Sequence, residues 1–360
     1  MNQAYFTKQN ATLLKGFLIL VIIAHNISNY IYPWFFSNEK GYEGWILPAY
    51  FLWCQENPFY IPKMILTFFG HYAVESFVIL SGYALAVLQS QEEWKFKSFF
   101  KKAFLKLYIP YLIGIFIYYI ITTLALLPVI SLKEILLNNY PFFFQSIFLV
   151  ANFIPGSLFI SPSTFWFVMI ILQLYLMFPL LSLVVKKGIL LTILVSFVFL
   201  TLSYMIDNYT EFEVFGTALL HAPEFMLGMF FGYKKYFSIP NRFFIYIFAI
   251  FALSILSPVT HYFSYTLGGI LILWLSTLSF KLKKLTKFFE KVGKNSLYLF
   301  LGNGIAYFPN TQILLHQYTL TPLTIISISA FLLETVLFAI IIKKITKYIT
   351  GELKFVKEAY

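Results

Sequence analysis

Long apolar runs recur along the whole chain and predict its architecture. Most are close to the ~20 residues that cross the hydrocarbon core of a bilayer as a helix. We predict about ten membrane-spanning helices, at Leu13–Tyr32, Ile65–Val87, Leu107–Val129, Phe165–Val185, Ile189–Ile206, Phe215–Tyr233, Phe243–Leu256, Tyr262–Phe280, Ser296–His316 and Leu323–Ile342. Pro141–Ile154 is also apolar but too short to cross, so we expect a helix there that lies at the interface or re-enters.

Basic residues alternate with these runs as the positive-inside rule requires. With the amino terminus in the cytoplasm, 23 of the 26 lysines and arginines fall in cytoplasmic segments, and only Lys40, Lys63 and Lys133 fall outside. Removing one span would place the later clusters on the wrong side. The pattern therefore predicts an all-α integral membrane protein with both termini in the cytoplasm, and most of the lysines serve this topology alone.

Composition agrees with this architecture. Only 11% of residues are charged, against about 25% in soluble domains, and 60% are hydrophobic. No soluble segment separates the runs, so we expect one transmembrane domain over residues 1–360. Topology explains the net charge of +11, so nucleic acid is not an expected partner. The single cysteine, Cys54, excludes an internal disulfide and a cysteine metal cluster, and we expect no metal.

The first run resembles a signal peptide in one respect, because Lys15 precedes its apolar core. Polar residues that include His25 and Asn26 follow Phe17–Ile23, where a small-residue cleavage site would be needed. We therefore expect a retained first span.

Ionisable side chains inside the spans are the candidates for function, because they are costly in hydrocarbon. His25 follows Lys15 by ten residues, or ~15 Å of helix, which places it near mid-membrane. Glu75 reaches a similar depth from the outer side. A carboxylate that orients an imidazole gives a general base for a hydroxyl group. The same two residues also fit a structural pair between helices, or a proton or ion pathway.

Other polar residues carry weaker predictions. His71 lies one turn from Glu75, and we expect it at the interface; His221 and Glu224 form a similar pair in the sixth span. For Glu224, a structural hydrogen bond is as good an interpretation as a functional one. Glu334 stands alone. The Ser81-Gly82 pair is typical of close helix packing, so we expect no nucleophile there.

Six segments in order resemble the membrane acyltransferase family 3. Its typical second span, GV-D/E-x-FFxLSGF, is similar to Ala73–Tyr83. The other segments are Leu14–Phe17 with His25; Phe99–Lys106 with Pro110-Tyr111; Phe165–Phe167 with Tyr175 and Pro179; Pro223, Phe225, Gly228 and Gly232; and Gly293, Ser296, Phe300 and Leu301. The resemblance covers nearly the whole chain.

This resemblance implies a membrane-embedded O-acyltransferase of the bacterial plasma membrane. Such proteins move an acyl group, foremost acetyl, from cytoplasmic acyl-CoA to a hydroxyl of an envelope or capsular polysaccharide, or of a lipid-linked sugar. It implies that His25 is catalytic and that Glu75 acts with it. It also implies that Lys15, Lys101, Lys102 and Lys106 hold the coenzyme A phosphates, for which clustered point charges are suited. The extracellular domain that some members carry is not expected.

The sequence departs from the family pattern at four points, which bear mainly on how the acyl-CoA donor is bound. Nine residues separate Lys15 from His25, where ten are usual, which turns Lys15 by one helical step. Lysines replace the two arginines of the basic segment, so bidentate phosphate binding is lost. Asn303 stands where a histidine is common, and His221 where an arginine is common.

Two rival hypotheses remain at this point. An exporter of a glycan or lipid-linked precursor has apolar spans with few buried charges too, but it has no need to bind coenzyme A. A structural or sensory partner of an envelope assembly would keep working after loss of every intramembrane polar residue. Binding of coenzyme A and substitution of His25 therefore separate the three hypotheses.

Overall fold

The computed structural model describes residues 8–30, 42–90, 95–157, 164–235, 241–314 and 322–352. Over these ranges every regular element is a helix, which confirms the all-α prediction. The α-helices are α1 (Lys8–Tyr30), α2 (Ile46–Glu56), α3 (Ile61–Phe69), α4 (Tyr72–Gln89), α5 (Phe96–Leu126), α6 (Leu132–Ile147), α7 (Trp166–Lys186), α8 (Ile189–Tyr209), α9 (Ala218–Tyr233), α10 (Asn241–Ser254), α11 (Pro258–Thr277), α12 (Thr286–Gly293), α13 (Ser296–Leu314) and α14 (Pro322–Glu352). Five short 3₁₀ helices join them: η1 (Pro58–Tyr60), η2 (Ala151–Phe153), η3 (Val214–Gly216), η4 (Leu278–Lys281) and η5 (Lys283–Leu285).

Seven of the described helices are long and apolar enough to cross a membrane, namely α1, α4, α5, α7, α8, α11 and α14. Their outward faces are apolar, as the bilayer requires: Leu190 of α8 and Leu333 of α14 are each 70% exposed. The length and composition of these helices make the chain a multi-pass membrane protein. The predicted spans at α9, α10 and α13 are not among the seven, so the ten-span count and the cytoplasmic termini stay predictions.

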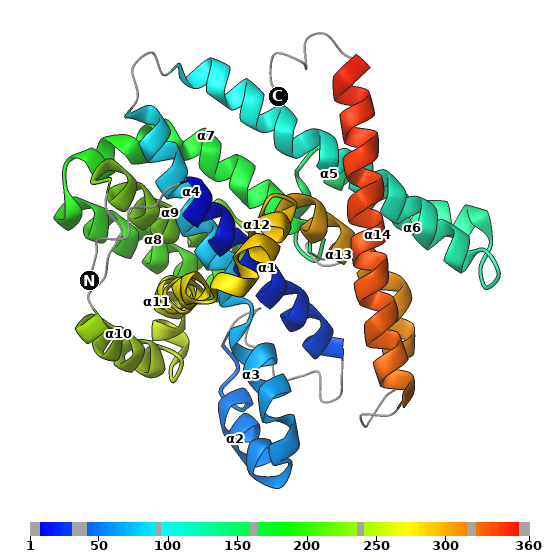
Figure 1. The fold of residues 1–360 in the computed structure, drawn as a ribbon, viewed down its shortest axis with the longest axis horizontal. Coiled ribbons are helices and arrows are strands. Elements are labelled where there is room, and N and C mark those ends of the chain that lie inside the picture. The colour runs from blue at the N-terminus through cyan, green and yellow to red at the C-terminus, as the bar shows by residue number, and fades with distance from the viewer. Residues whose placement is uncertain are drawn as a thin grey trace.

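Helix α1 runs through the middle of the molecule (Figure 1). It packs against α3, α4, α11, α12 and α13. The α2–α3 hairpin projects from one end of the bundle, and α5, α6 and α14 lie to one side of it. The hairpin has a small core of its own, made of Ile46, Tyr50, Met64 and Phe68.

Glycines set the closest helix crossings. A methyl group on Gly82 of α4 would overlap the Phe225 carbonyl of α9, and one on Gly228 of α9 would overlap the Ile79 carbonyl of α4. Small residues let two backbones approach in this way inside a membrane. The prediction that Ser81-Gly82 serves packing is therefore confirmed for Gly82, and it locks α4 and α9 together.

The predicted span Ile65–Val87 is not one helix. Helix α3 ends at Phe69 and α4 begins at Tyr72, so the helical conformation is interrupted at Gly70-His71. The apolar run continues through the break, and hydropathy alone therefore gives no sign of it. This break lies directly against α1.

The short apolar element after α5 is longer than predicted. It begins at Leu132 rather than at Pro141, and it ends at Ile147. Ser131 and Glu134 form a capping box at its start, which fixes that boundary. Their hydrogen bonds lower the pKa of the Glu134 carboxyl. Its placement at an interface stays a prediction.

Candidate functional site

His25 is buried in α1, with 2% of its surface exposed, and its ring is held at both nitrogens. Nδ1 lies 2.9 Å from the Leu66 carbonyl oxygen, and Nε2 lies 3.0 Å from Nδ2 of Asn29. A carbonyl only accepts, so Nδ1 carries the proton, and Nε2 accepts from the Asn29 amide. His25 is thereby fixed as the neutral tautomer whose basic nitrogen is Nε2.

The break between α3 and α4 makes room for this histidine. An added Cβ at Gly70 would lie 2.6 Å from the His25 Cβ and 2.5 Å from the Leu66 carbonyl oxygen. Only a residue without a side chain fits there. The same Leu66 carbonyl accepts from the Gly70 backbone N–H at 2.9 Å, so it serves both the end of α3 and the imidazole.

Glu75 does not orient His25, and that part of the prediction is wrong. Its Oε2 lies 2.8 Å from Nδ1 of His221 on α9, and both side chains are fully buried. Glu75 is on the face of α4 that the glycine crossing presses onto α9, because it lies four residues before Ile79 and seven before Gly82. The Glu75 carboxylate therefore forms its hydrogen bond with the His221 imidazole of α9.

The Glu75–His221 pair holds a defined number of protons. Nε2 of His221 lies 2.9 Å from the Phe215 carbonyl oxygen, so Nε2 must donate. One further proton lies between Nδ1 and Glu75. Glu224 of α9 lies beside His221, as predicted. Its carboxylate accepts from the Thr266 hydroxyl of α11, which is the structural hydrogen bond between helices that the sequence had left open.

These three side chains form one compact buried group. Ligating atoms of Glu75, His221 and Glu224 all lie within 4.8 Å of one another. The three side chains are of types that can bind a cation. However, the 2.8 Å distance between Glu75 Oε2 and His221 Nδ1 is that of a hydrogen bond, so a proton lies between these two atoms. We assign it as a proton-sharing group and derive no metal chemistry from it.

Aromatic contacts connect this group to His25. The rings of His25 and His71 are 6.0 Å apart, His71 and Tyr265 are 6.1 Å apart, and Tyr265 and His221 are 6.3 Å apart. The sequence placed His71 at the interface, and the structure buries it within the protein beside His25. Glu334 lies half-buried on α14.

A second polar pair adjoins His25 on α1. Asn26 donates from Nδ2 to Oδ1 of Asn303 on α13, and both residues are buried. The sequence noted Asn303 only as a departure from the family pattern. Their contact joins positions 277 residues apart, which no local spacing reveals.

A cavity of about 910 Å³ opens beside Lys15. Five lysines line it: Lys15, Lys95, Lys102, Lys106 and Lys294. Three of the four predicted donor-binding lysines are thus brought together. Lys101 is exposed and does not line the cavity, because one helical step turns it away from the face that Lys102 and Lys106 share.

Two lysines of this cavity were missed as site residues. Lys95 precedes Lys102 by seven residues, so helical spacing gave a signal for it. Lys294 follows α12, which glycines bring against α1: methyl groups on Gly16 and Gly293 would overlap the carbonyls of Phe289 and Thr12. Only the tertiary contact places Lys294 beside Lys15.

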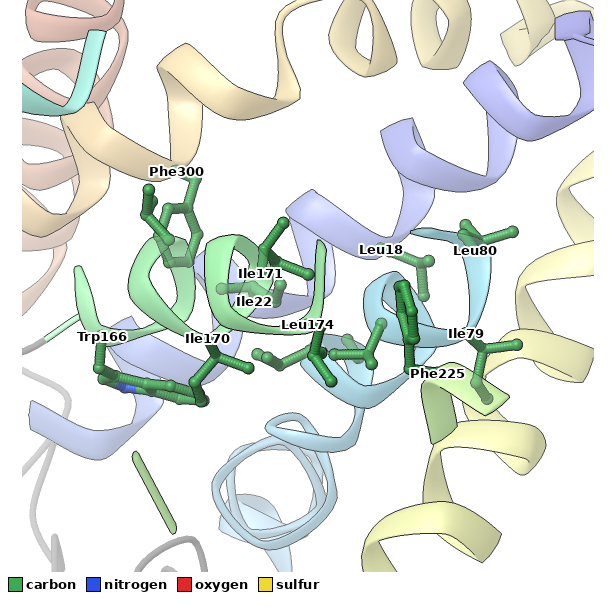
Figure 2. Close-up of a cluster of buried hydrophobic side chains, with 14 of the residues drawn as sticks. Leu18, Ile22, Ile79, Leu80, Trp166, Ile170, Ile171, Leu174, Phe225 and Phe300 are labelled. Atoms are coloured by element: carbon green, nitrogen blue, oxygen red, sulfur yellow. The ribbon is translucent and has the colours of Figure 1, made fainter. Parts of the chain in front are cut away.

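A narrow slot of about 150 Å³ adjoins the cavity, and both share Lys15, Leu107, Tyr175, Ser296 and Leu297 in their walls. The slot follows α1 past Ile19 as far as Ile22, one helical turn before His25. Figure 2 shows Ile22, Ile171 and Phe300 of this wall gathered from α1, α7 and α13. The arrangement joins a basic cavity to the neighbourhood of a buried base.

Comparison with known proteins identifies a family for the chain. A family model described as an acyltransferase domain matches residues 9–344, nearly the whole chain. No curated protein and no solved structure matches the chain. The chain belongs to the acyltransferase 3 family.

Proposed function

From its membership of this family, we propose that the protein transfers an acyl group, foremost acetyl, from cytoplasmic coenzyme A to a sugar hydroxyl. The acceptor is an envelope or capsular polysaccharide, or a lipid-linked sugar, and the bilayer is the bacterial plasma membrane. One observation carries the proposal: the lysine-lined cavity continues into an apolar slot that ends one turn from His25.

The cavity suits the donor. Coenzyme A has several phosphate charges, and five lysines converge on about 910 Å³ beside the aromatic rings of Phe99 and Tyr298, which can stack on adenine. The pantetheine arm is thin and extended, as the slot is. From Lys15 to His25 the helix rises ~15 Å, so an arm that enters beside Lys15 carries its thioester toward His25.

His25 is the general base of the proposed step. The acceptor hydroxyl takes the place of the Asn29 amide at Nε2. As its oxygen bonds to the acyl carbon, its proton passes to Nε2 and the carbonyl π pair moves onto the acyl oxygen. When the C=O bond re-forms, the C–S bond breaks and the thiolate takes the proton from the imidazolium. The products are the ester and free coenzyme A.

Glu75 has a different role from the one predicted. Leu66 and Asn29 orient His25, whereas Glu75 and His221 hold α4 to α9 and keep a proton in the group near Tyr265. The burial of the whole group in the protein excludes water that would hydrolyse the thioester.

The test is transfer of radiolabelled acetyl from acetyl-CoA into envelope glycans, in membranes that contain wild type or His25→Ala at equal protein level. Loss of a general base predicts a fall of about 10²–10⁴-fold. Binding of coenzyme A to purified protein is measured in parallel. Transfer that survives in His25→Ala would refute the mechanism. No binding of coenzyme A would refute the enzyme and favour the exporter.

A further inference from the structure

Two residue stripes define where the slot ends. On α1, Lys15, Ile19, Ile22 and Asn26 follow one another at spacings of four, three and four residues, which places them on one helix face. On α13, Ser296, Phe300 and Asn303 do the same at spacings of four and three. All but the last member of each stripe line the slot, and the two last members are bonded to each other. The Asn26–Asn303 pair therefore lies about one helical turn beyond Ile22 and Phe300, the last lining residues of these two helices.

This pair leaves one strong donor unused. The Oδ1 of Asn303 accepts from Asn26, but Nδ2 of Asn303 has no hydrogen-bond partner among the residues that the structure describes. The side chain is fully buried, with 0% exposure. Buried amide donors are nearly always bonded in native proteins, because leaving one unpaired costs stability. Such a donor is available to an acceptor atom that arrives with a ligand.

The backbone around Asn303 holds the donor still. Asn303 lies between Gly302 and Gly304. A methyl group on Gly302 would overlap the Thr335 carbonyl of α14, and one on Gly304 would overlap the Thr164 hydroxyl beside Phe165. Helix α13 is thus wedged between two neighbours at this residue. Fixed donors that need no rearrangement are the kind that stabilise a developing charge best.

We propose that the Asn303 amide is the oxyanion donor of the acyl transfer, binding the thioester carbonyl oxygen that the slot delivers. The inference rests on the proposed function. When the acceptor oxygen adds to the acyl carbon, the π pair of the carbonyl moves onto the carbonyl oxygen. The Nδ2–H of Asn303 then donates a hydrogen bond to that negatively charged oxygen. His25 directly precedes Asn26 on α1, so the base and the oxyanion donor lie at the same depth along the helix, about 100° apart around it.

The competing interpretation is that Asn26 and Asn303 only join α1 to α13. The two interpretations differ in which variants keep activity. An oxyanion donor predicts that Asn303→Leu and Asn303→Asp, which lack the N–H, lower kcat about 10²–10³-fold with the KM for acetyl-CoA nearly unchanged. Asn303→His keeps a ring N–H and should recover part of the loss. A purely structural contact predicts less folded protein but unchanged kcat per folded molecule.

A matched control is Asn152→Asp. Asn152 is also buried, and its Nδ2 donates to the Gly216 carbonyl at 2.7 Å, but it lies outside the slot. This variant loses a buried amide donor just as Asn303→Asp does. Its kcat per folded molecule should equal that of wild type.

The decisive measurement uses ¹³C-labelled acetyl-CoA and infrared difference spectroscopy, which need no acceptor. A bound carbonyl that accepts from Asn303 should absorb at lower frequency than free acetyl-CoA in wild type and Asn152→Asp, and this shift should vanish in Asn303→Leu. Binding with the same carbonyl frequency in wild type and Asn303→Leu would overturn the oxyanion assignment. Absence of acetyl-CoA binding in wild type would instead overturn the proposed function beneath it.

Discussion

The side-chain amide of Asn29 donates to Nε2 of His25 at 3.0 Å, one helical turn along the same helix. Its Oδ1 is buried and has no hydrogen-bond partner in the described part of the chain. Rotation of this amide would turn the oxygen toward Nε2. Asn29 can therefore serve the neutral imidazole as a donor and the imidazolium as an acceptor.

This arrangement predicts the effect of Asn29→Leu. The variant loses the hydrogen bond that holds the imidazole ring in place until the acceptor hydroxyl replaces Asn29 at Nε2, and a misplaced base lowers the rate. We expect kcat to fall at least about tenfold at unchanged binding of acetyl-CoA. The control is Asn208→Leu on α8, an exposed asparagine that bonds the Tyr204 carbonyl. Equal kcat in Asn29→Leu and wild type would contradict this role.

Gly70→Ala should disable the base without touching the donor cavity. The new Cβ would lie 2.6 Å from that of His25, so the imidazole must move. A shift of about 1 Å at a reacting group costs about 100-fold in rate. Transfer of labelled acetyl measures the loss, and equilibrium binding of coenzyme A should not change. Gly351→Ala is the matched control, because nothing lies within 4 Å of its added Cβ.

The Glu75–His221 pair predicts a non-additive double-mutant cycle. His221→Leu leaves two carboxyl groups buried without the imidazole, and breaking a buried pair costs about 3–5 kcal/mol. Glu75→Leu should cost a similar amount. The double variant should be more stable than the sum of the two predicts, because neither partner of the pair is left without the other. Thermal unfolding in detergent measures all three, and simple additivity would argue against the pair.

Neighbouring lysines should differ in coenzyme A binding. Lys102→Ala removes a charge from the cavity wall and should raise the dissociation constant about tenfold, the scale of one charge-assisted contact. Lys101→Ala removes the same charge one residue away, on the exposed side, and should change it less than about twofold. Titration of purified protein with coenzyme A at low salt compares them. Equal effects would mean that the phosphates lie elsewhere.

Local patterns in the sequence predicted some features and not others for physical reasons. Apolar runs of the right length became helices, because hydrocarbon leaves the backbone few alternatives. The break at Gly70-His71 was missed, because both sides of it are apolar. Helical spacing places Lys101 on a different face of the helix from Lys102 and Lys106. The basic cluster as a whole had nevertheless suggested all three as ligands of the coenzyme A phosphates.

Tertiary contacts decided the chemistry of the site. The sequence suggested that Glu75 would orient His25, and helical spacing set His221 beside Glu224. Instead, Glu75 pairs with His221, 146 residues away, because Gly82 and Gly228 let the two backbones meet. Which carboxylate meets which imidazole depends on crossings between helices, and those crossings depend on glycines that spacing rules do not weigh.

The hold of Leu66 on His25 has a wider consequence. Leu66 belongs to α3, and α3 packs with α2 as a hairpin that stands out from the bundle with its own small core (Figure 1). The orientation of the imidazole therefore depends on the position of the α2–α3 hairpin as well as on the helix bundle. Any ligand that binds this hairpin is therefore thermodynamically linked to the orientation of the imidazole: a ligand that favours the hairpin position seen here favours the hydrogen bond from His25 to Leu66, and that hydrogen bond in turn favours the ligand.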